Sequence, residues 1–129
     1  MTQLLIDTHT FAWIMSEPER LPRAARMLID TADQTHASVA SLYEIAQKVR
    51  LGKWPQMEPA VRSLAEEAVA IGVDLVPLTG SISIQAGLLD WPHRDPFDRM
   101  IAATALVLGL VLVSADTAFD SLPELRRVW

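Results

Sequence analysis

Residues 96–116 read PFDRMIAATALVLGLVLVSAD, and this stretch decides the fold that we predict for the chain. The segment 96–108 is apolar almost all round a helical turn, which is typical of a buried helix. Gly109 ends that helix, and the apolar run 110–113 follows as a buried strand. The most hydrophobic part, 100–115, covers only 16 residues and is interrupted by the glycine, so it is too short to span a membrane as one helix.

Outward from this stretch, predicted strands alternate with predicted helices. Leu4, Leu5 and Ile6 form a continuous apolar run, which is typical of a central parallel strand. The further predicted strands are 35–39, 73–78 and 110–113, with a possible edge strand at 125–129. The predicted helices are 8–15, 22–29, 41–51, a long amphipathic helix over 57–71, 81–89 and 96–108. This order predicts an α/β fold of three layers, with helices on both faces of a mostly parallel sheet of four to five strands.

Length and composition narrow the class of protein. A chain of 129 residues that is 50% hydrophobic predicts a single domain, 1–129, with a core of its own. The absence of cysteine excludes disulfides and thiolate metal sites. The net charge of −5 argues against a protein that holds nucleic acid by charge alone, although bound divalent cations would add local positive charge.

The first residues, Met1-Thr2-Gln3-Leu4, carry neither a basic segment nor a long apolar run. We therefore expect no signal peptide and no membrane association. The lack of cysteine fits the same expectation, and we predict a cytoplasmic protein.

Four acids occupy related places in the predicted elements: Asp7, Glu44, Asp98 and Asp116. Asp7 and Asp116 follow apolar runs that are predicted as buried strands. Glu44 and Asp98 fall in the first turn of predicted helices. In an open α/β sheet, strand ends and helix starts of this kind meet at one edge, where such folds bind their ligands. We therefore predict that the four acids gather into one site.

Each acid also has a purely structural explanation. The segments 41–44 (SLYE) and 95–98 (DPFD) both fit a capping box, in which an acid at the third helical position reaches back to the cap. Asp7 and Asp116 could each cap the turn that follows a strand. Taken singly, each acid is well explained as a helix-start residue. Capping alone, however, does not require the four acids to meet.

Carboxylates gathered at one edge repel one another, and a divalent cation relieves that repulsion. Because the chain has no cysteine, oxygen ligands dominate, which favours Mg²⁺ or Mn²⁺. Four carboxylates can hold one ion, or two ions about 3.5–4 Å apart, with phosphate oxygens and water as the remaining ligands. Such a site is typical of a metal-dependent enzyme that acts on phosphate through a metal-activated water.

A few other polar residues could support this site. Thr8 and Ser114 flank the acids and could hydrogen-bond a carboxylate or a water molecule. Asp95 fits the N-cap of the helix better than it fits a ligand. Arg99 lies beside Asp98 and could meet a phosphate backbone. The histidines show no metal-ligand spacing: His9, His36 and His93.

Four stretches together resemble one family, the PIN-domain ribonuclease toxins of bacterial toxin–antitoxin pairs, also called the VapC-like group. The matching stretches are 5–13 (LIDTHTFAW), 41–48 (SLYEIAQK) with 51–53 (LGK), 94–99 (RDPFDR) with 101–103 (IAA), and 112–116 (LVSAD). They follow the family's order along the whole chain. Ser114 stands where the family often has threonine and Tyr43 where it often has tryptophan, and neither departure touches the acids.

The resemblance implies a single PIN-like nuclease domain over residues 1–129 with an α/β/α fold. It implies a Mg²⁺- or Mn²⁺-dependent endoribonuclease whose catalytic, metal-binding quartet is Asp7, Glu44, Asp98 and Asp116. It also implies a homodimer that is inhibited by a small antitoxin protein encoded beside it. RNA as the substrate comes from this resemblance and not from residue chemistry.

Other classes of protein stay open. A metal-dependent phosphatase of another α/β type is one alternative, but haloacid-dehalogenase-like enzymes need a second Asp where this chain has His9. A receiver domain needs acids before Asp7 and a lysine after the last strand, and residues 3–6 and 114–120 provide neither. The third alternative is a catalytically idle interaction module. Trp13 and Trp54 could serve as interface anchors or as ordinary core residues.

Overall fold

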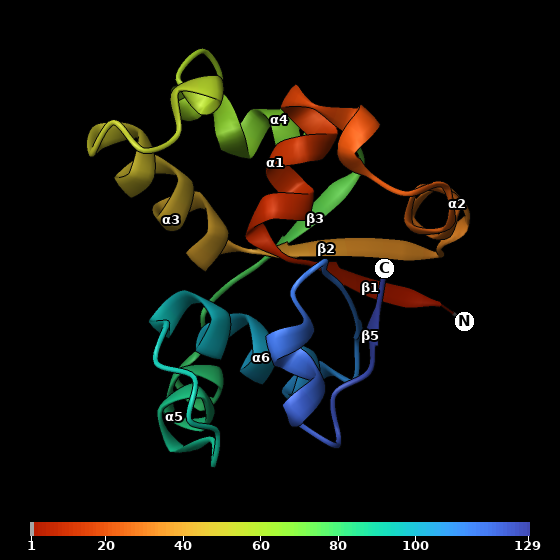
Figure 1. Ribbon diagram of the computed structural model, residues 1–129, viewed down its shortest axis with the longest axis vertical. Coiled ribbons are helices and arrows are strands. Elements are labelled where there is room, and N and C mark those ends of the chain that lie inside the picture. Colours follow the sequence, from red (N-terminus) through yellow and green to blue (C-terminus); the bar gives the residue numbers. More distant parts are fainter. Residues whose placement is uncertain (1) are drawn as a thin grey trace.

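Five parallel strands form the centre of the computed structural model, which describes residues 2–129 (Figure 1). The strands are β1 (Gln3–Ile6), β2 (Gln34–Ser38), β3 (Val73–Val76), β4 (Val111–Val113) and β5 (Arg127–Val128). Their order across the sheet is β3-β2-β1-β4-β5. The register pairs Leu4 with Thr35 on one side and with Val111 on the other. The predicted parallel sheet of four to five strands is confirmed.

Helices cover both faces of this sheet, which confirms the three layers. The six α-helices are α1 (Thr8–Ser16), α2 (Arg23–Thr31), α3 (Val39–Arg50), α4 (Leu64–Ala70), α5 (Gly80–Leu88) and α6 (Pro96–Leu108). Successive side chains of a strand point to opposite faces. Leu4 and Ile6 therefore pack with α1 to α4, whereas Leu5 packs with α6. Figure 1 shows α1 to α4 on one side of the sheet and α5 with α6 on the other.

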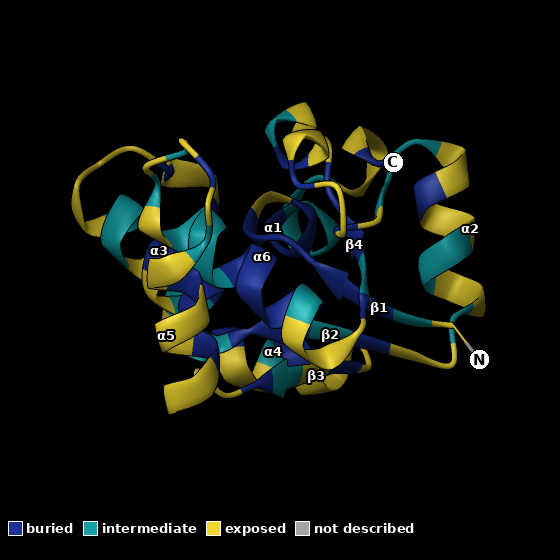
Figure 2. Ribbon diagram, turned by 90° about the horizontal axis from the view of Figure 1, so that it is seen from below, coloured by how far each residue is buried: buried dark blue, intermediate teal, exposed yellow. Residues whose placement is uncertain are grey.

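The stretch quoted first folds as its pattern predicts. Asp95 caps α6, Pro96 occupies its first turn, and the helix ends before Gly109, which adopts the left-handed conformation at φ 66°. Residues Ile101 to Ala105 are buried. Figure 2 shows β1 and much of α6 in the colour of buried residues. None of the helices within residues 2–129 combines the length and the apolar character needed to cross a bilayer.

The long helix predicted over 57–71 is wrong. Two short 3-10 turns, η2 (Pro55–Met57) and η3 (Val61–Ser63), take up its first half, and α4 begins only at Leu64. Pro55 and Pro59 cause this, because proline lacks an N–H and disfavours helical geometry in the residue before it. The apolar face survives the break, since Leu64 and Ala68 still enter the core.

The order of the strands creates a switch point between β1 and β4. From β1 the chain moves outward to β2 and β3, then returns through α5 and α6 to place β4 on the other side of β1. Crevices at the carboxyl ends of such strands are where open α/β sheets bind ligands. Asp7 follows β1 directly, and the chain after β4 leads to Asp116.

Candidate active site

Asp7 is the most firmly held of the predicted site residues. It is buried at the N-cap of α1, where its Oδ1 accepts hydrogen bonds from Thr10 N (2.9 Å) and Thr10 Oγ1 (2.7 Å). Its Oδ2 accepts a short hydrogen bond from the hydroxyl of Ser114. Both oxygens are therefore oriented by neighbours. Asp7 caps a helix as the structural explanation predicts, and it stands directly after β1 at the switch point between β1 and β4.

Ser114 links the two strand-end acids. While its hydroxyl donates to Asp7, its Oγ accepts from the backbone N–H of Asp116 (3.0 Å). Asp116 is exposed and caps the 3-10 turn η4 (Thr117–Ser121), because its Oδ1 accepts from Ala118 N (2.9 Å). Ser114 therefore supports the acids, as predicted, by connecting the end of β1 to the loop after β4.

Arg127 fixes the loop that carries Asp116. Its guanidinium binds both oxygens of Asp120 (2.8 and 2.9 Å) and also donates to the carbonyl of Ser114 (2.9 Å). This ion pair lowers the pKa of the Asp120 carboxyl. It also raises the pKa of the Arg127 guanidinium, to which the nearby Asp116 charge adds. Asp120 is therefore engaged in this loop through Arg127.

Glu44 lies in the second turn of α3, because the helix starts earlier than predicted. The N-cap is Ser38, whose Oγ accepts from Ala40 N (3.0 Å), so the predicted capping box at 41–44 is wrong. Strand β2 ends at Ser38, one residue short of the predicted end, and the helix begins at once. Glu44 therefore loses its structural explanation as a cap.

The carboxylate of Glu44 is buried and only half satisfied. The residue is 3% exposed, and its Oε2 accepts from Lys48 Nζ (2.8 Å). Its Oε1 is buried and has no hydrogen-bond partner within the described part of the chain. A buried carboxylate oxygen without a donor is costly, and a bound ion or water is the usual explanation.

The hydroxyl of Thr8 is engaged with another side chain of the protein. It shares a buried hydrogen bond of 2.9 Å with the hydroxyl of Ser41. The bond joins the start of α1 to the first turn of α3. Thr8 and Ser41 thus hold the ends of β1 and β2 together beneath the acids.

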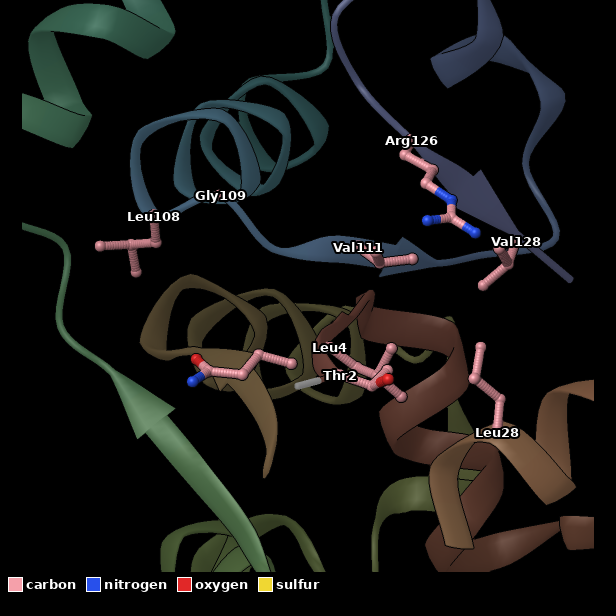
Figure 3. A pocket seen from close by; sticks show the side chains of 9 residues that line it. Thr2, Leu4, Leu28, Leu108, Gly109, Val111, Arg126 and Val128 are labelled. Atoms are coloured by element: carbon pink, nitrogen blue, oxygen red, sulfur yellow. The ribbon is translucent and has the colours of Figure 1, made fainter. Parts of the chain in front are cut away.

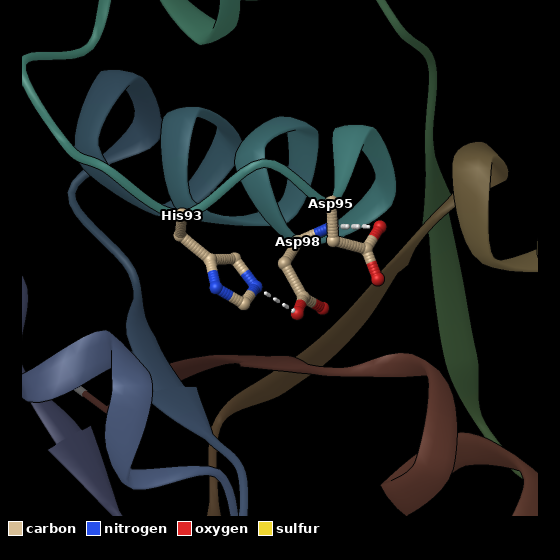
Figure 4. Close-up of side chains that lie close together, drawn as sticks. All are labelled: His93, Asp95 and Asp98. Carbon is tan, nitrogen blue, oxygen red and sulfur yellow. Dashed lines mark hydrogen bonds and ion pairs between the residues drawn. The ribbon is translucent and has the colours of Figure 1, made fainter.

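Asp98 stands at the third position of α6, and its carboxylate turns away from the cap. The cap itself is as predicted, because Asp95 Oδ1 accepts from the N–H groups of Phe97 (2.8 Å) and Asp98 (3.4 Å). Asp98 Oδ2 instead bonds His93 Nε2 at 2.7 Å (Figure 4). Burial raises the pKa of the Asp98 carboxyl to about 6, and the His93 hydrogen bond opposes that rise. Repulsion from Asp95 and Glu44 adds to it.

The four acids suit a hard cation. All are oxygen donors, Glu44 offers an unpaired buried oxygen, and the pKa of Asp98 is raised by burial and by like charge, which a cation would relieve. Within residues 2–129, the trio of acid or imidazole groups whose ligand atoms lie within 4.8 Å of one another is His93, Asp95 and Asp98. Of the four predicted acids only Asp98 belongs to this trio, and within the described residues no three of the four reach that spacing.

Arg99 has a different role from the predicted contact with phosphate. Guanidinium has five N–H donors, and here they reach five backbone carbonyls in the last turn of α5 and in the loop before α6. The acceptors are the carbonyls of Ala86, Gly87, Leu89, Trp91 and His93, at 2.6 to 3.4 Å. Arg99 therefore organises the loop before α6 and has no donor left for a ligand.

His93 is the residue that the sequence interpretation missed. It was set aside for lack of metal-ligand spacing, yet the structure places its ring on Asp98. The available signal was its place two residues before the N-cap Asp95, because the chain turns sharply at a cap and can bring such a residue back over the first turn of the helix.

The ring of His9 belongs to an aromatic cluster. Its exposed ring lies between Trp13 (centroids 5.7 Å apart) and Trp54 (4.9 Å). Lys48 Nζ lies 5.4 Å from the centre of the Trp54 ring and also forms an ion pair with Glu44, so it connects the aromatic cluster to that acid. Trp54 is buried in the main core cluster, which favours the core explanation for this tryptophan.

A cavity of about 450 Å³ lies at the opposite edge of the sheet (Figure 3). Its lining includes Leu4 and Val111 near the amino ends of β1 and β4, with Gly109, Arg126 and Val128. This cavity contains none of the predicted acids. The predicted acids therefore lie outside this hollow.

Sequence comparison connects this chain to a known family. The sequence profile of the PIN domain matches residues 4–125. Ribonuclease VapC22 of Mycobacterium tuberculosis (strain ATCC 25618 / H37Rv) is 34% identical over 76 residues, which cover 57% of this chain and 58% of that protein. The aligned part thus spans little more than half of that relative.

Solved structures share the fold over nearly the whole chain. VapBC-1 from nontypeable Haemophilus influenzae superposes with a TM-score of 0.71 at 18% identity, covering 98% of this chain and 97% of that one. VapBC2 from Rickettsia felis, bound to a DNA fragment from its promoter, gives 0.70 at 14% identity and 98% of both chains. VapC20 of Mycobacterium tuberculosis, a Sarcin-Ricin loop cleaving toxin, gives 0.65 at 16% identity, covering 92% and 93%.

Proposed function

This chain belongs to the PIN domain family, and from that premise we propose that it is a metal-dependent endoribonuclease, the toxin of a toxin–antitoxin pair. The support from relatives is that one is a ribonuclease and that several structures with this fold are toxin–antitoxin complexes. The support from this chain is the set of acids at the switch point between β1 and β4.

One observation carries the proposal furthest. Glu44 Oε1 is a buried carboxylate oxygen with no partner among the described residues, and its helix α3 follows directly on the carboxyl end of β2. Helix capping does not explain Glu44, since Ser38 caps α3. A cation held by oxygens explains both the burial and the missing donor.

Asp7, Glu44, Asp98 and Asp116 would hold Mg²⁺ or Mn²⁺. Such a cation, when bound, supplies a water of lowered pKa as nucleophile and charge stabilisation on the phosphate. Ser114 and Thr10 keep the carboxylate of Asp7 in one orientation. Lys48 occupies Oε2 of Glu44 and leaves Oε1 without a partner within residues 2–129. Asp116 is exposed and would be accessible to a substrate.

The phosphodiester of an RNA is the substrate that we propose, and the cytoplasm is the compartment. The net charge of −5 argues against a broad basic surface, so the contact with the phosphate backbone relies on bound cations. RNA recognition commonly depends on exposed bases in loops. Structured RNAs with single-stranded loops are therefore the substrates to test.

The test is cleavage of a mixed pool of structured RNAs by purified protein with Mn²⁺, with Mg²⁺ and with EDTA. We expect cleavage that needs metal and that Asp98→Asn abolishes. Asp30→Asn is the matched control, because Asp30 is an exposed acid on α2 away from the site. Cleavage in EDTA, or equal cleavage by Asp98→Asn, would contradict the proposal.

A small antitoxin protein is the partner that we propose. It would be encoded beside this chain and would block the acidic edge. Co-expression of the neighbouring small protein should yield a complex that no longer cleaves the RNA pool. Two proteins that purify separately, with cleavage unchanged on mixing, would contradict this partner.

We also propose a homodimer, supported by an exposed apolar groove beside the site. Tyr43 is 62% exposed and stacks on Phe97, with ring centroids 5.7 Å apart. Val39, Leu78 and Met100 line the same groove. Apolar patches of this kind mark interaction surfaces. Light scattering should give twice the chain mass, and Tyr43→Glu should give a monomer; a wild-type monomer at micromolar concentration would contradict the dimer.

A further inference from the structure

The imidazole of His93 is held in place from several directions. Its ring stacks on Trp91, with centroids 4.6 Å apart and the planes 30° from each other. Trp91 is itself buried and anchored, because its Nε1 donates to Ser121 Oγ (2.8 Å) and its ring packs on Phe119. The orientation of the His93 ring is thus set by packing rather than by Asp98.

Arg99 holds the backbone of the same segment. Its Nη1 donates to the carbonyls of Trp91 (2.6 Å) and His93 (2.9 Å). The loop between α5 and α6 therefore has a defined path, although it contains no regular secondary structure. Arg99 follows Asp98 directly in α6, so the helix that carries the acid also clamps the loop that carries the histidine.

From this clamped ring, Nε2 reaches one oxygen of Asp98. The distance from Nε2 to Oδ2 is 2.7 Å, and no hydrogen bond within residues 2–129 reaches Oδ1. Figure 4 shows the imidazole and the carboxylate facing each other beside the N-cap of α6. One oxygen is thus taken by the histidine, and the other is free for a ligand.

We propose that His93 is a positioning residue that fixes the carboxylate of Asp98 for cation binding, with Trp91 and Arg99 holding the imidazole in place. The inference rests on the proposed metal site. Residues that orient a metal ligand through a hydrogen bond typically change metal affinity or activity by about 10- to 100-fold when they are replaced. His93 acts through Asp98 and is not itself a catalytic residue.

Two substitutions separate the hydrogen bond from the ring packing. His93→Gln keeps an N–H that can reach Asp98 but loses the stack on Trp91. His93→Phe keeps the stack but has no donor. The control is His36→Gln, because His36 is a half-buried histidine in β2 whose Nε2 has no partner within the described residues.

The readouts are Mn²⁺ affinity by calorimetry and the separate kcat and KM of RNA cleavage. We expect His93→Phe to weaken Mn²⁺ binding and to lower kcat by about 10-fold or more, with little change in KM. His93→Gln should retain Mn²⁺ affinity within about threefold of the wild-type value, a loss well below that expected for a missing hydrogen bond. The His36→Gln control should match the wild type.

The opposite ranking, with Phe active and Gln defective, would assign His93 to packing and overturn the proposal. Equal defects in both variants with intact folding would make the imidazole a direct ligand. Wild-type behaviour of both variants would leave the imidazole without a role. Either result would overturn the proposal that His93 positions Asp98. If the wild type binds no Mn²⁺, the proposed function fails. In that case a double-mutant cycle of His93→Phe and Asp98→Ala, measured in EDTA, tests the contact between the two side chains. If the two changes in melting temperature add, the contact is overturned, and if they do not add, it is supported.

Discussion

The two sides of the acidic edge are built in different ways. On the strand side, Asp7 is buried, and three hydrogen bonds from Thr10 and Ser114 hold its two oxygens. On the helix side, Asp98 is half-buried and receives one side-chain hydrogen bond, from His93. The strand side is thus fixed by the core, while the helix side is fixed by a loop.

This difference separates folding from chemistry. The carboxylate of Asp7 completes the hydrogen bonding of the α1 N-terminus and of β4, so the fold needs it whether or not a cation is present. Burial raises the pKa of the Asp98 carboxyl, so in the absence of a cation a neutral group at this position would make the folded protein more stable. The carboxylate of Asp98 therefore contributes less to stability than that of Asp7.

The largest effect that we expect on stability is at Asp7. Asp7→Ala removes the cap of α1 and leaves the Thr10 N–H and the Ser114 hydroxyl without their acceptor, which should cost about 3 kcal/mol. Asp98→Ala should cost less than about 1 kcal/mol, since one half-exposed contact is lost. Urea unfolding in EDTA measures both, and equal losses would remove the distinction between the two sides.

Metal binding should join the two sides. Mn²⁺ at about 100 times its Kd should stabilise the wild type by about 2.7 kcal/mol, because it binds only the folded state. Asp7→Asn and Asp98→Asn should each abolish this gain, while Asp30→Asn keeps it. Melting temperatures with Mn²⁺ and with EDTA give the result. A gain retained in either site variant would place the ion on one side only.

The loop on the helix side can be tested through Arg99. Arg99→Lys replaces five donors in a planar arrangement by one ammonium group and should destabilise the protein by about 2 kcal/mol. Arg127→Lys, whose partner Asp120 is exposed, is the matched control and should cost under about 1 kcal/mol. Urea unfolding compares them. A larger loss at Arg127 would show that the strand-side loop is the more constrained one.

The smallest expected effect is the pH dependence of stability at Asp98. Its pKa of about 6 in the folded protein exceeds the usual 3.8, so the folded state binds more protons than the unfolded state between these values. Stability without metal should therefore fall as pH rises from about 4 to about 6 and then level off. The change is about 1 kcal/mol once solvent screening of this half-exposed group is allowed for.

Asp98→Asn removes this titration and is the control for it. In EDTA, the difference in unfolding free energy between the variant and the wild type should grow with pH across that window. A difference that stays constant from pH 4 to pH 8 would show that the carboxyl of Asp98 titrates alike in the folded and unfolded chain.

Local patterns predicted the elements whose signals agree with one another. Helix α6 begins at Pro96 and ends before Gly109 as expected, because a cap, a first-turn proline and a left-handed glycine all mark the same bounds. The helix predicted over 57–71 was wrong because the prediction rested on the spacing of apolar residues and did not allow for Pro59, which disfavours a helix at this point. The predicted start of α3 was wrong because two serines, Ser38 and Ser41, both suit an N-cap. The position at which β2 ends determines which of them caps the helix.

By itself, the sequence determined the strand and helix order and the parallel sheet, because periodicity, caps and glycines act over a few residues, and it supplied the four acids as candidates for a site. Only the tertiary structure decided how each acid is held. It showed that one oxygen of Glu44 has no partner within residues 2–129, that Ser114 joins Asp7 to the Asp116 backbone, and that His93 bonds Asp98 while Arg99 binds backbone carbonyls. These contacts join residues from different elements, and their geometry depends on packing that local pattern does not encode.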